Sequence, residues 1–345
     1  MPNRKLRVGI AGYGIVGKRR RQCIDLNPNL ITVAVSDISF KHEGTFSDGV
    51  RFYSNYQGLF KEKLDILFVS LPNYLASECT ISGLERGLHV FCEKPPGRSV
   101  QDIRDVIATE KVRQHLKLKY GFNHRYHDSV MEAKNVIESG QYGEVINLRG
   151  IYGKSNIIPF DKGWRAERQY AGGGILLDQG IHILDMIRHF VGEFEEIKSF
   201  VSNSYWEHDV EDNAYAIMRN QKGCIAMLHS TATQWQHKFR LEITMRECLL
   251  ELTGILSGSK SYGEERLKII PKKDGSSVGS FMEITNSYLE DYSWQREIDE
   301  FADVVIHDKP VENGNSCEAL KVMELVYRVY CADRRWQEAF DIPTP

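Results

Sequence analysis

Two acid–base side chains stand four residues apart in the segment from Gly172 to His182, which reads GGGILLDQGIH. On a helix this spacing places Asp178 and His182 on one face. Histidine titrates near neutral pH, so His182 can exchange a proton, and the carboxylate of Asp178 can orient a bound hydroxyl. The spacing also leaves two alternatives open, a surface pair and two ligands of a metal ion.

A lysine that could act with them follows a short apolar run. Lys94 lies in the segment Cys92-Glu93-Lys94-Pro95-Pro96, directly after a predicted strand at 89–91. The carboxyl ends of strands line the cofactor crevice in open α/β sheets, and the two prolines hold the chain rigid there. An ammonium group in such a place can stabilise negative charge that develops on an oxygen.

A glycine-rich segment near the N-terminus has the spacing of a phosphate-binding loop. It consists of Gly12, Tyr13, Gly14, Ile15, Val16 and Gly17, the pattern GxGxxG. The first glycine permits a tight turn, the second lets the backbone approach a diphosphate, and the third lets helix and strand pack closely. A diphosphate at this place would meet the free N–H groups and the positive dipole end of the following helix.

An acidic residue follows at the spacing expected for a ribose-binding carboxylate. Asp37 ends the second predicted strand, 20 residues beyond Gly17. A carboxylate accepts hydrogen bonds from the ribose hydroxyls and repels a 2′-phosphate, and neither Ile38 nor Ser39 offers a positive charge to attract one. The sequence therefore predicts NAD as the cofactor, with NADP less favoured. A cap of the next turn is the alternative role for Asp37.

The elements that would position these residues change character along the chain. Strand patterns at 6–10, 31–35, 64–69, 89–91 and 117–122 alternate with helical patterns, which predicts βαβ units and a parallel sheet. Longer strand-like stretches joined by short turns follow, and they predict an antiparallel sheet; these stretches are 145–152, 196–201, 213–218, 224–231, 239–245 and 248–252. Helices are predicted at 177–191, 293–306 and 316–335. We expect an α/β protein with domains at 1–122 and 123–345.

Charge and composition exclude several classes of partner. The formal net charge is −3 and 42% of residues are hydrophobic, so no basic field for nucleic acid or anionic membrane is expected. The one basic cluster, Lys18 to Arg21, is interpreted as a solvated helix face. No apolar run approaches the ~18 residues that a membrane helix needs. The seven cysteines are scattered without a CxxC pair, which favours the reducing cytoplasm over a disulfide-bonded secreted protein.

Together these motifs resemble a known family. GxGxxG, the aspartate after the second strand, EKP and GGGxxxDxGxH occur in the order and at the intervals of the Gfo/Idh/MocA oxidoreductases, and the resemblance runs from Leu6 to about Arg335. It implies a Rossmann fold followed by an α/β domain with a large open, mostly antiparallel sheet. It also implies no metal and a homodimer or homotetramer built on the outer face of that sheet. The number of strands between 196 and 252 favours such an assembly independently, because few helices are available to cover them.

The resemblance also assigns roles to residues. Lys94, Asp178 and His182 match the family's catalytic lysine, aspartate and histidine, and Glu93 and Pro95 match residues on the cofactor side. Further cofactor-side positions are Asn123 and Arg125, the pair Trp164 and Arg165, and the loop of Ser70, Leu71, Pro72 and Asn73. One position departs from the pattern, since Ala76 stands where the family often has a histidine.

The implied function is hydride transfer between NAD and a ring hydroxyl or ketone of a sugar or nucleotide-sugar. His182 or Lys94 would exchange the hydroxyl proton, and the sequence leaves open which of the two does so. Two alternatives are a glycosidase that keeps its NAD and acts by transient oxidation, and a non-catalytic regulator that binds the cofactor. Lys94, Asp178 and His182 together argue against the regulator, which has no need of them.

Overall fold

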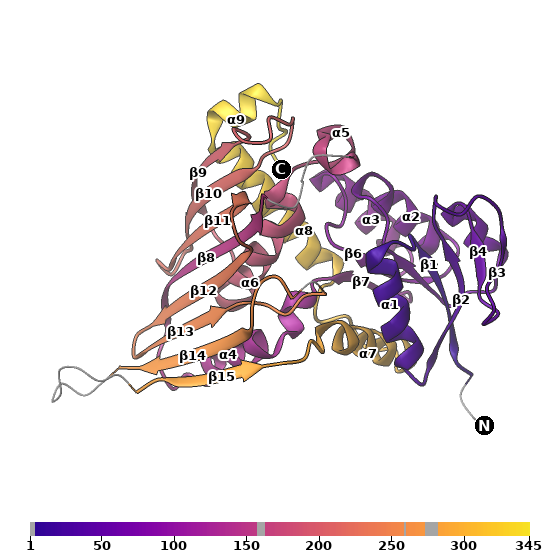
Figure 1. Cartoon of the computed structure of the whole chain (residues 1–345), viewed down its shortest axis with the longest axis horizontal. Coiled ribbons are helices and arrows are strands. Elements are labelled where there is room, and N and C mark those ends of the chain that lie inside the picture. Colours follow the sequence, from indigo (N-terminus) through magenta and orange to yellow (C-terminus); the bar gives the residue numbers. More distant parts are fainter. Residues whose placement is uncertain (1–3, 157–162, 259, 273–281) are drawn as a thin grey trace. The chain divides into compact units, whose positions relative to one another are not determined.

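The computed structural model describes residues 4–156, 163–258, 260–272 and 282–345. The chain forms two compact units, which can be followed by sequence colour in Figure 1. The first unit contains the chain up to Phe122 with Gln169–Gly172 and Trp294–Met323, and the second contains Asn123–Arg168, Gly173–Ser293 and Glu324–Pro345. The predicted domains divide the chain once, at residue 122. In the structure the chain also returns to the first unit at 294–323.

The first unit is built on a mostly parallel sheet with the strand order β3-β4-β2-β1-β5-β6-β7. Its strands are β1 (Leu6–Ala11), β2 (Leu30–Ser36), β3 (Gly44–Thr45), β4 (Arg51–Tyr53), β5 (Ile66–Val69), β6 (His89–Glu93) and β7 (Leu118–Gly121). Neighbouring strands run parallel except β3 and β4. The chain passes from β1 to β2 on one side and later returns to β5 on the other side of β1, so the carboxyl end of β1 is a topological switch point.

Helices cover both faces of this sheet. They are α1 (Ile15–Leu26), α2 (Asn73–Glu85), α3 (Val100–Lys111), α7 (Ser293–Ile306) and the 3-10 turn η1 (Tyr56–Lys61), with the first part of α8 (Ser316–Ala332). Ile24 of α1 and Phe301 of α7 lie in one core with Phe68 and Phe91 of the sheet. On the other face α2 packs closely enough that a Cβ on Gly83 would lie 2.8 Å from the Leu67 side chain. Burial on both faces explains the apolar runs that predicted the strands.

The second unit is built on a sheet with the strand order β15-β14-β13-β12-β8-β11-β10-β9, in which β8 and β11 are parallel and the other pairs are antiparallel. Its strands are β8 (Val145–Ser155), β9 (Glu196–Ser202), β10 (Asn213–Arg219), β11 (Ile225–Gln234), β12 (Lys238–Met245), β13 (Cys248–Thr253), β14 (Glu265–Pro271) and β15 (Ile284–Tyr288). The large sheet is seen at the purple-to-orange part of Figure 1.

Helices lie against one face of this sheet. They are α4 (Asp128–Glu138), α6 (Ile181–Val191), the end of α8, α9 (Arg334–Ala339) and the short turns η2 (Asn123–Tyr126), η3 (Trp164–Ala166) and η4 (Leu176–Gly180), and α5 (Arg168–Ala171) joins the two units in sequence. A Cβ on Gly150 of β8 would lie 2.8 Å from the Ile183 side chain of α6. On the opposite face Phe200, Tyr215 and Ile217 are exposed, so burial alternates along β10 as expected for a one-sided sheet.

The predicted fold class is confirmed: a parallel α/β unit is followed by a unit with a large, mostly antiparallel sheet. Strands β3, β4, β14 and β15 are additional to the predicted ones. Among the described residues, no helix has both the length and the apolar character needed to cross a bilayer.

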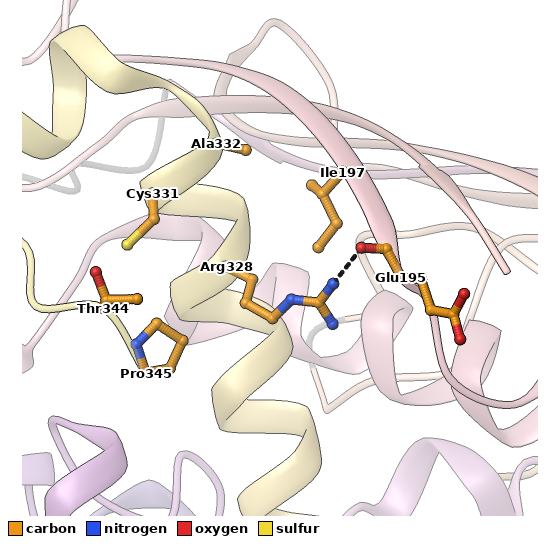
Figure 2. A pocket seen from close by; sticks show the side chains of 7 residues that line it. All are labelled: Glu195, Ile197, Arg328, Cys331, Ala332, Thr344 and Pro345. Atoms are coloured by element: carbon orange, nitrogen blue, oxygen red, sulfur yellow. Dashed lines mark hydrogen bonds between the residues drawn. The ribbon is translucent and has the colours of Figure 1, made fainter.

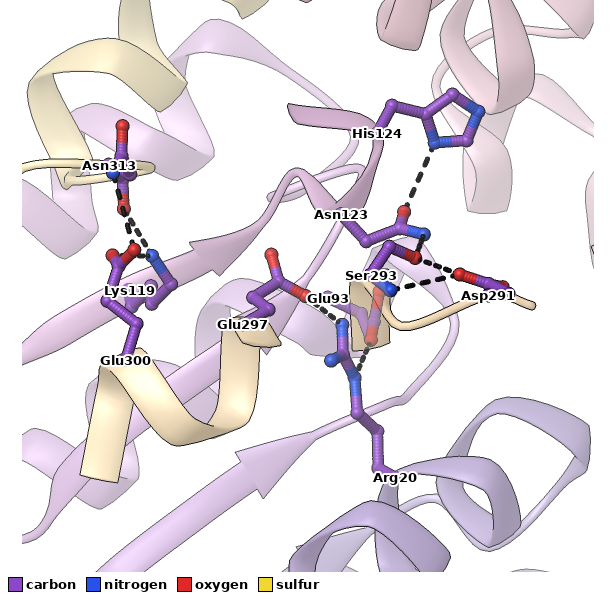
Figure 3. A network of polar contacts seen from close by, with 10 residues as sticks. All are labelled: Arg20, Glu93, Lys119, Asn123, His124, Asp291, Ser293, Glu297, Glu300 and Asn313. Atoms are coloured by element: carbon purple, nitrogen blue, oxygen red, sulfur yellow. Dashed lines mark hydrogen bonds and ion pairs between the residues drawn. The ribbon is translucent and has the colours of Figure 1, made fainter. Parts of the chain in front are cut away.

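The interpretation of Lys18 to Arg21 as a solvated helix face is wrong for one of its members. Arg20 is completely buried in the first unit. Its guanidinium donates to Glu93 at 2.5 Å and to Glu297 of α7 at 2.7 Å, and it lies over the rings of Phe91 and Trp294. Figure 3 shows Arg20 between the two carboxylates. A buried charge requires such partners, and both stand far from Arg20 in the sequence.

Candidate functional site

The glycine-rich loop has the backbone geometry that its sequence predicts. Gly12 has φ +88°, and a Cβ at this position would lie 2.3 Å from the carbonyl oxygen of Ser70. A Cβ on Gly17 would lie 1.9 Å from the carbonyl oxygen of Gly12. Gly14, at the N-terminus of α1, is exposed, and no side chain caps the helix there. The first and third glycines are thus required by the fold, and the second leaves the helix N-terminus accessible to an anion.

Asp37 lies at the end of β2 with its carboxylate fixed by two backbone donors. The N–H groups of Tyr13 and Ser39 each donate to it at 2.9 Å. Although partial burial alone would raise it, the pKa of Asp37 is lowered by the hydrogen bonds from Ser39 and Tyr13. The predicted carboxylate therefore stands beside the glycine-rich loop as an anion with remaining acceptor capacity.

The other predicted cofactor-side residues of the first unit follow neighbouring strands. Ser70, Leu71 and Pro72 come directly after β5, and the Ser70 N–H donates to the carbonyl of Ala11 at the end of β1. Asn73 is buried and donates to the carbonyl oxygen of Ala171 at 2.7 Å. Glu93 and Lys94 come at the end of β6, where Glu93 is held by Arg20.

Together these residues lie at the carboxyl ends of β1, β2, β5 and β6. The first unit thus brings the predicted phosphate loop, ribose acid and EKP lysine to one edge of its sheet.

In the second unit, Asp178 and His182 lie on consecutive turns but not on one regular α-helix. Residues Leu176–Gly180 form a π-helical turn, and α6 begins at Ile181. His182 is only 4% exposed, and its ring stacks on His124 with 3.6 Å between ring centroids. The Asp178 carboxylate lies 3.8 Å from Arg165, whose guanidinium covers the ring of Trp164. The prediction of a single helix from 177 is therefore corrected at its first turn.

Aromatic and hydroxyl groups surround this segment. The Tyr262 hydroxyl donates to Gln179 at 3.0 Å, and its ring packs against Tyr152 and His237. The Tyr152 hydroxyl lies 3.2 Å from Nε2 of His124. Burial raises the pKa of both Tyr152 and Tyr262, so both phenols remain protonated donors at neutral pH. The second unit thus collects a carboxylate, an amide, two phenols and imidazoles around one segment.

Sequence reasoning did not single out His124 or Tyr152. The signal for His124 was its place between Asn123 and Arg125 in a segment already selected. The signal for Tyr152 was weaker. The alternation of residues along a predicted strand indicates on which face of the sheet Tyr152 lies, but not which side chains it contacts.

Two predicted cofactor residues are engaged elsewhere in the second unit. Arg125 forms a buried bidentate ion pair with Asp185 of α6, with contacts of 2.8 and 2.6 Å. Asn123 donates to Ser293 at 3.3 Å, and its carbonyl lies 3.2 Å from His124 (Figure 3). These contacts fix η2 beside α6, and a direct role of either residue at the cofactor stays a prediction.

A pocket of about 410 Å³ elsewhere on the second unit contains none of the predicted residues. Figure 2 shows its lining, in which Arg328 donates to the backbone carbonyl of Glu195 at 2.7 Å. A second bond from Arg328 goes to the carbonyl of Phe194 at 2.6 Å. The guanidinium thus holds the backbone before β9. Among the described residues, no group of three His, Cys, Asp or Glu is arranged to hold a metal ion.

Comparison with known families matches both units. Residues 6–122 match the description "Oxidoreductase family, NAD-binding Rossmann fold", and residues 130–251 match the "GFO/IDH/MocA C-terminal domain". The chain belongs to the Gfo/Idh/MocA oxidoreductases. Its first unit is therefore an NAD-binding Rossmann fold, as predicted.

Several similar curated proteins are dehydrogenases and reductases named for sugars and polyols. A levoglucosan dehydrogenase of Pseudarthrobacter phenanthrenivorans is 26% identical over 57% of this chain and 54% of its own length. A D-glucoside 3-dehydrogenase of Escherichia coli is 27% identical over 67% of this chain and 71% of its own length. The chain spans about half the length of the levoglucosan enzyme and of a 1,5-anhydro-D-fructose reductase of Ensifer adhaerens, at 54% and 51%.

Solved structures share the fold over nearly the whole chain. A levoglucosan dehydrogenase in complex with NADH superposes with a TM-score of 0.82 at 19% identity, covering 96% of this chain and 98% of that one. A myo-inositol 2-dehydrogenase from Lactobacillus plantarum gives a TM-score of 0.74 at 21% identity, covering 98% of both chains.

Proposed function

We propose that this protein is an NAD-dependent dehydrogenase or reductase that acts on a ring hydroxyl or ketone of a sugar or nucleotide-sugar. The observation that carries the proposal is the grouping of Asp178, Gln179 and His182 on one short segment, with the Tyr262 phenol bonded to Gln179. A few fixed polar groups among aromatic rings are suited to bind hydroxyls and the apolar face of a sugar ring. The first unit supplies the fold for the cofactor.

The residues of the first unit fit NAD. The N–H groups around Gly14 are suited to a diphosphate, and Asp37, ionised and fixed, is suited to accept the ribose hydroxyls. Bound NAD would supply the acceptor or donor of the hydride. Asp37 and the glycine-rich loop then bind and orient, and they take no part in proton transfer.

The proton is handled by this chain's own groups. In the oxidative direction His182 or Lys94 accepts the proton of the substrate hydroxyl. Asp178 accepts a hydrogen bond from a neighbouring hydroxyl and fixes which ring carbon reacts.

The proposed substrate class rests on the relatives. Their names include levoglucosan, D-glucoside, inositol and a dTDP-deoxyhexose. The enzyme named for the dTDP-deoxyhexose is a reductase of Streptomyces antibioticus, which is 27% identical over 71% of this chain. These compounds share a ring with adjacent hydroxyl or keto groups. We extend that shared chemistry, and no single compound among them, to this chain.

The test is a substrate screen that follows NADH absorbance with free sugars, inositols, UDP-sugars and dTDP-sugars. With a compound that reacts, His182→Ala should lower kcat by ~10²-fold or more while the affinity for NAD changes little, because acid–base help is worth ~10²–10⁴-fold. His189→Ala, on the same helix α6, is the matched control and should keep kcat. Absence of turnover with every class, or wild-type kcat in His182→Ala, would contradict the proposal.

The proposal includes a homo-oligomer that covers the outer face of the large sheet. Phe200, Ile217, Tyr215 and Ile225 are 79%, 55%, 48% and 46% exposed on neighbouring strands. A contiguous apolar surface of this kind is costly in water. Light scattering at micromolar concentration should give a dimer or tetramer mass, and Ile217→Lys should reduce it. A monomer mass for the unaltered protein would refute this part.

The cellular compartment also remains a proposal. None of the seven cysteines forms a disulfide, which agrees with a reducing compartment such as the cytoplasm.

A further inference from the structure

A fully buried carboxylate lies directly against the start of the segment that carries Asp178 and His182. Glu211 precedes β10 and is 0% exposed. It accepts hydrogen bonds from the N–H groups of Gly174 at 2.8 Å and Leu176 at 2.9 Å. Its own backbone carbonyl accepts the N–H of Ile175 at 3.0 Å. Three successive N–H groups at the entry to η4 are thus held by this one residue.

These N–H groups need partners because of their position. The first turn of a helical segment has donors without intrahelical acceptors, and a negative charge near that end is stabilised by the helix dipole. The Gly174 carbonyl in turn accepts the N–H of Asp178 at 2.9 Å. Any displacement of Gly174 is therefore transmitted through one hydrogen bond to Asp178.

A tyrosine also donates to the carboxylate of Glu211. The hydroxyl of Tyr330 on α8 donates to the Glu211 carboxylate at 2.7 Å and is itself buried. Burial raises the pKa of Glu211, while the charge of Arg168 and the bonds from Tyr330 and Gly174 oppose that rise. The carboxylate thus accepts from three donors in a fully buried site.

Two of the three glycines before Asp178 are explained by this contact. A Cβ on Gly174 would lie 2.1 Å from the carbonyl oxygen of Glu211, and a Cβ on Gly173 would lie 2.2 Å from the hydroxyl of Tyr330. Neither distance is possible for real atoms. The triple glycine therefore admits a backbone and a tyrosine, in addition to any role toward a ligand.

We propose that Glu211, clamped by Tyr330, is a positioning residue that fixes the direction in which the Asp178–His182 segment leaves the triple glycine. The inference rests on the function proposed above, since it concerns the geometry of that site. Glu211 touches neither substrate nor cofactor in this role. A displacement of about 1 Å in reacting groups can cost ~10²-fold in rate, so loosening this clamp should reduce kcat.

The decisive variant is Glu211→Gln, which keeps the size of the side chain but turns an N–H₂ group toward N–H donors. We expect kcat to fall at least ~10-fold with the Kd for NADH unchanged. Asp212→Asn is the matched control, because Asp212 is adjacent and equally buried but accepts from Tyr205 and Trp206. Asp212→Asn should keep kcat within ~3-fold. Equal losses in both variants, or wild-type kcat in Glu211→Gln, overturn the inference.

A second variant covers the case in which Glu211→Gln does not fold. Tyr330→Phe removes the hydroxyl that donates to Glu211 at 2.7 Å and leaves the rest of the side chain in place. We expect kcat to fall with the Kd for NADH unchanged, and wild-type kcat in Tyr330→Phe overturns the inference.

A third readout separates this inference from the proposed function. Amide hydrogen exchange of residues 174–182 should accelerate in Glu211→Gln and not in Asp212→Asn, whether or not a substrate has been found. If the unaltered protein turns over no sugar but exchange accelerates as stated, the proposed function fails and the structural role of Glu211 stands. Unchanged exchange in Glu211→Gln removes the positioning role itself.

Discussion

Replacing Arg20 by methionine tests the reasoning about buried charge in the first unit. The side chain of Arg20 is 0% exposed, as is that of Glu297, while Glu93 is 13% exposed. Methionine is similar in size but loses the cation–π contacts with Phe91 and Trp294, and it leaves two carboxylates without a cation. Removing one partner of a buried pair costs about 3–5 kcal/mol of unfolding free energy, because the remaining charge stays desolvated. We expect a loss of that size.

The matched control is the same substitution one residue later. The Arg21 side chain pairs with Asp48, which is 51% exposed, so Arg21→Met should cost only a small fraction of the Arg20→Met loss. Urea unfolding of both variants, followed by fluorescence, gives the comparison. Arg20→Met with Glu297→Leu should recover much of the stability, since apolar side chains can replace a buried ion pair. Equal losses in Arg20→Met and Arg21→Met would refute the reasoning.

Two further predictions concern the cofactor and acid stability. Asp37 should make NAD bind at least ~10-fold more tightly than NADP, or about 1.4 kcal/mol, and Asp37→Ser with Ile38→Arg should shift the ratio toward NADP; calorimetric titration with equal affinities would contradict this. Burial works against ionisation of Glu265, yet His127 and the Ser129 N–H lower its pKa from 4.5 to about 2. A lowered folded-state pKa adds stability above pH 4.5, so about 3 kcal/mol should be lost as the pH falls from 4.5 to 2. Glu265→Gln should flatten this dependence in urea titrations and the exposed Glu264→Gln should not.

The first unit could be predicted well from the sequence because its information is local. A strand, a glycine-rich turn and a helix lie within Leu6 to Leu26, and the structure places each of them there. Full burial of β5 gives a run of four apolar residues, which marks the strand whatever its neighbours are. The short strands β3 and β4 escaped prediction because two or three residues carry no period.

The sequence named the candidate site residues but could not predict how they are arranged in space. The spacing of Asp178 and His182 implied a shared helical face, but it could not show the π-helical turn at Leu176–Gly180. Such a turn depends on what packs against it, here Ser230, whose hydroxyl donates to the carbonyl of Ile175 at 3.1 Å. His182 stacks on His124, which belongs to a different element. The periodicity of residues within one element does not indicate such a contact.

The partners of buried charges are the part that sequence reasoning misses most consistently, and the cause is physical. A charge without water needs a partner, but any acid that the fold brings near satisfies that need, however far away it is in sequence. Arg20 pairs with Glu297 and His127 pairs with Glu265, and each pair is separated by more than a hundred residues in the sequence. A local pattern can therefore indicate that a motif binds or reacts, while the groups that hold it in place are set by tertiary packing. Glu211, which carries no motif of its own, is such a group for the Asp178–His182 segment.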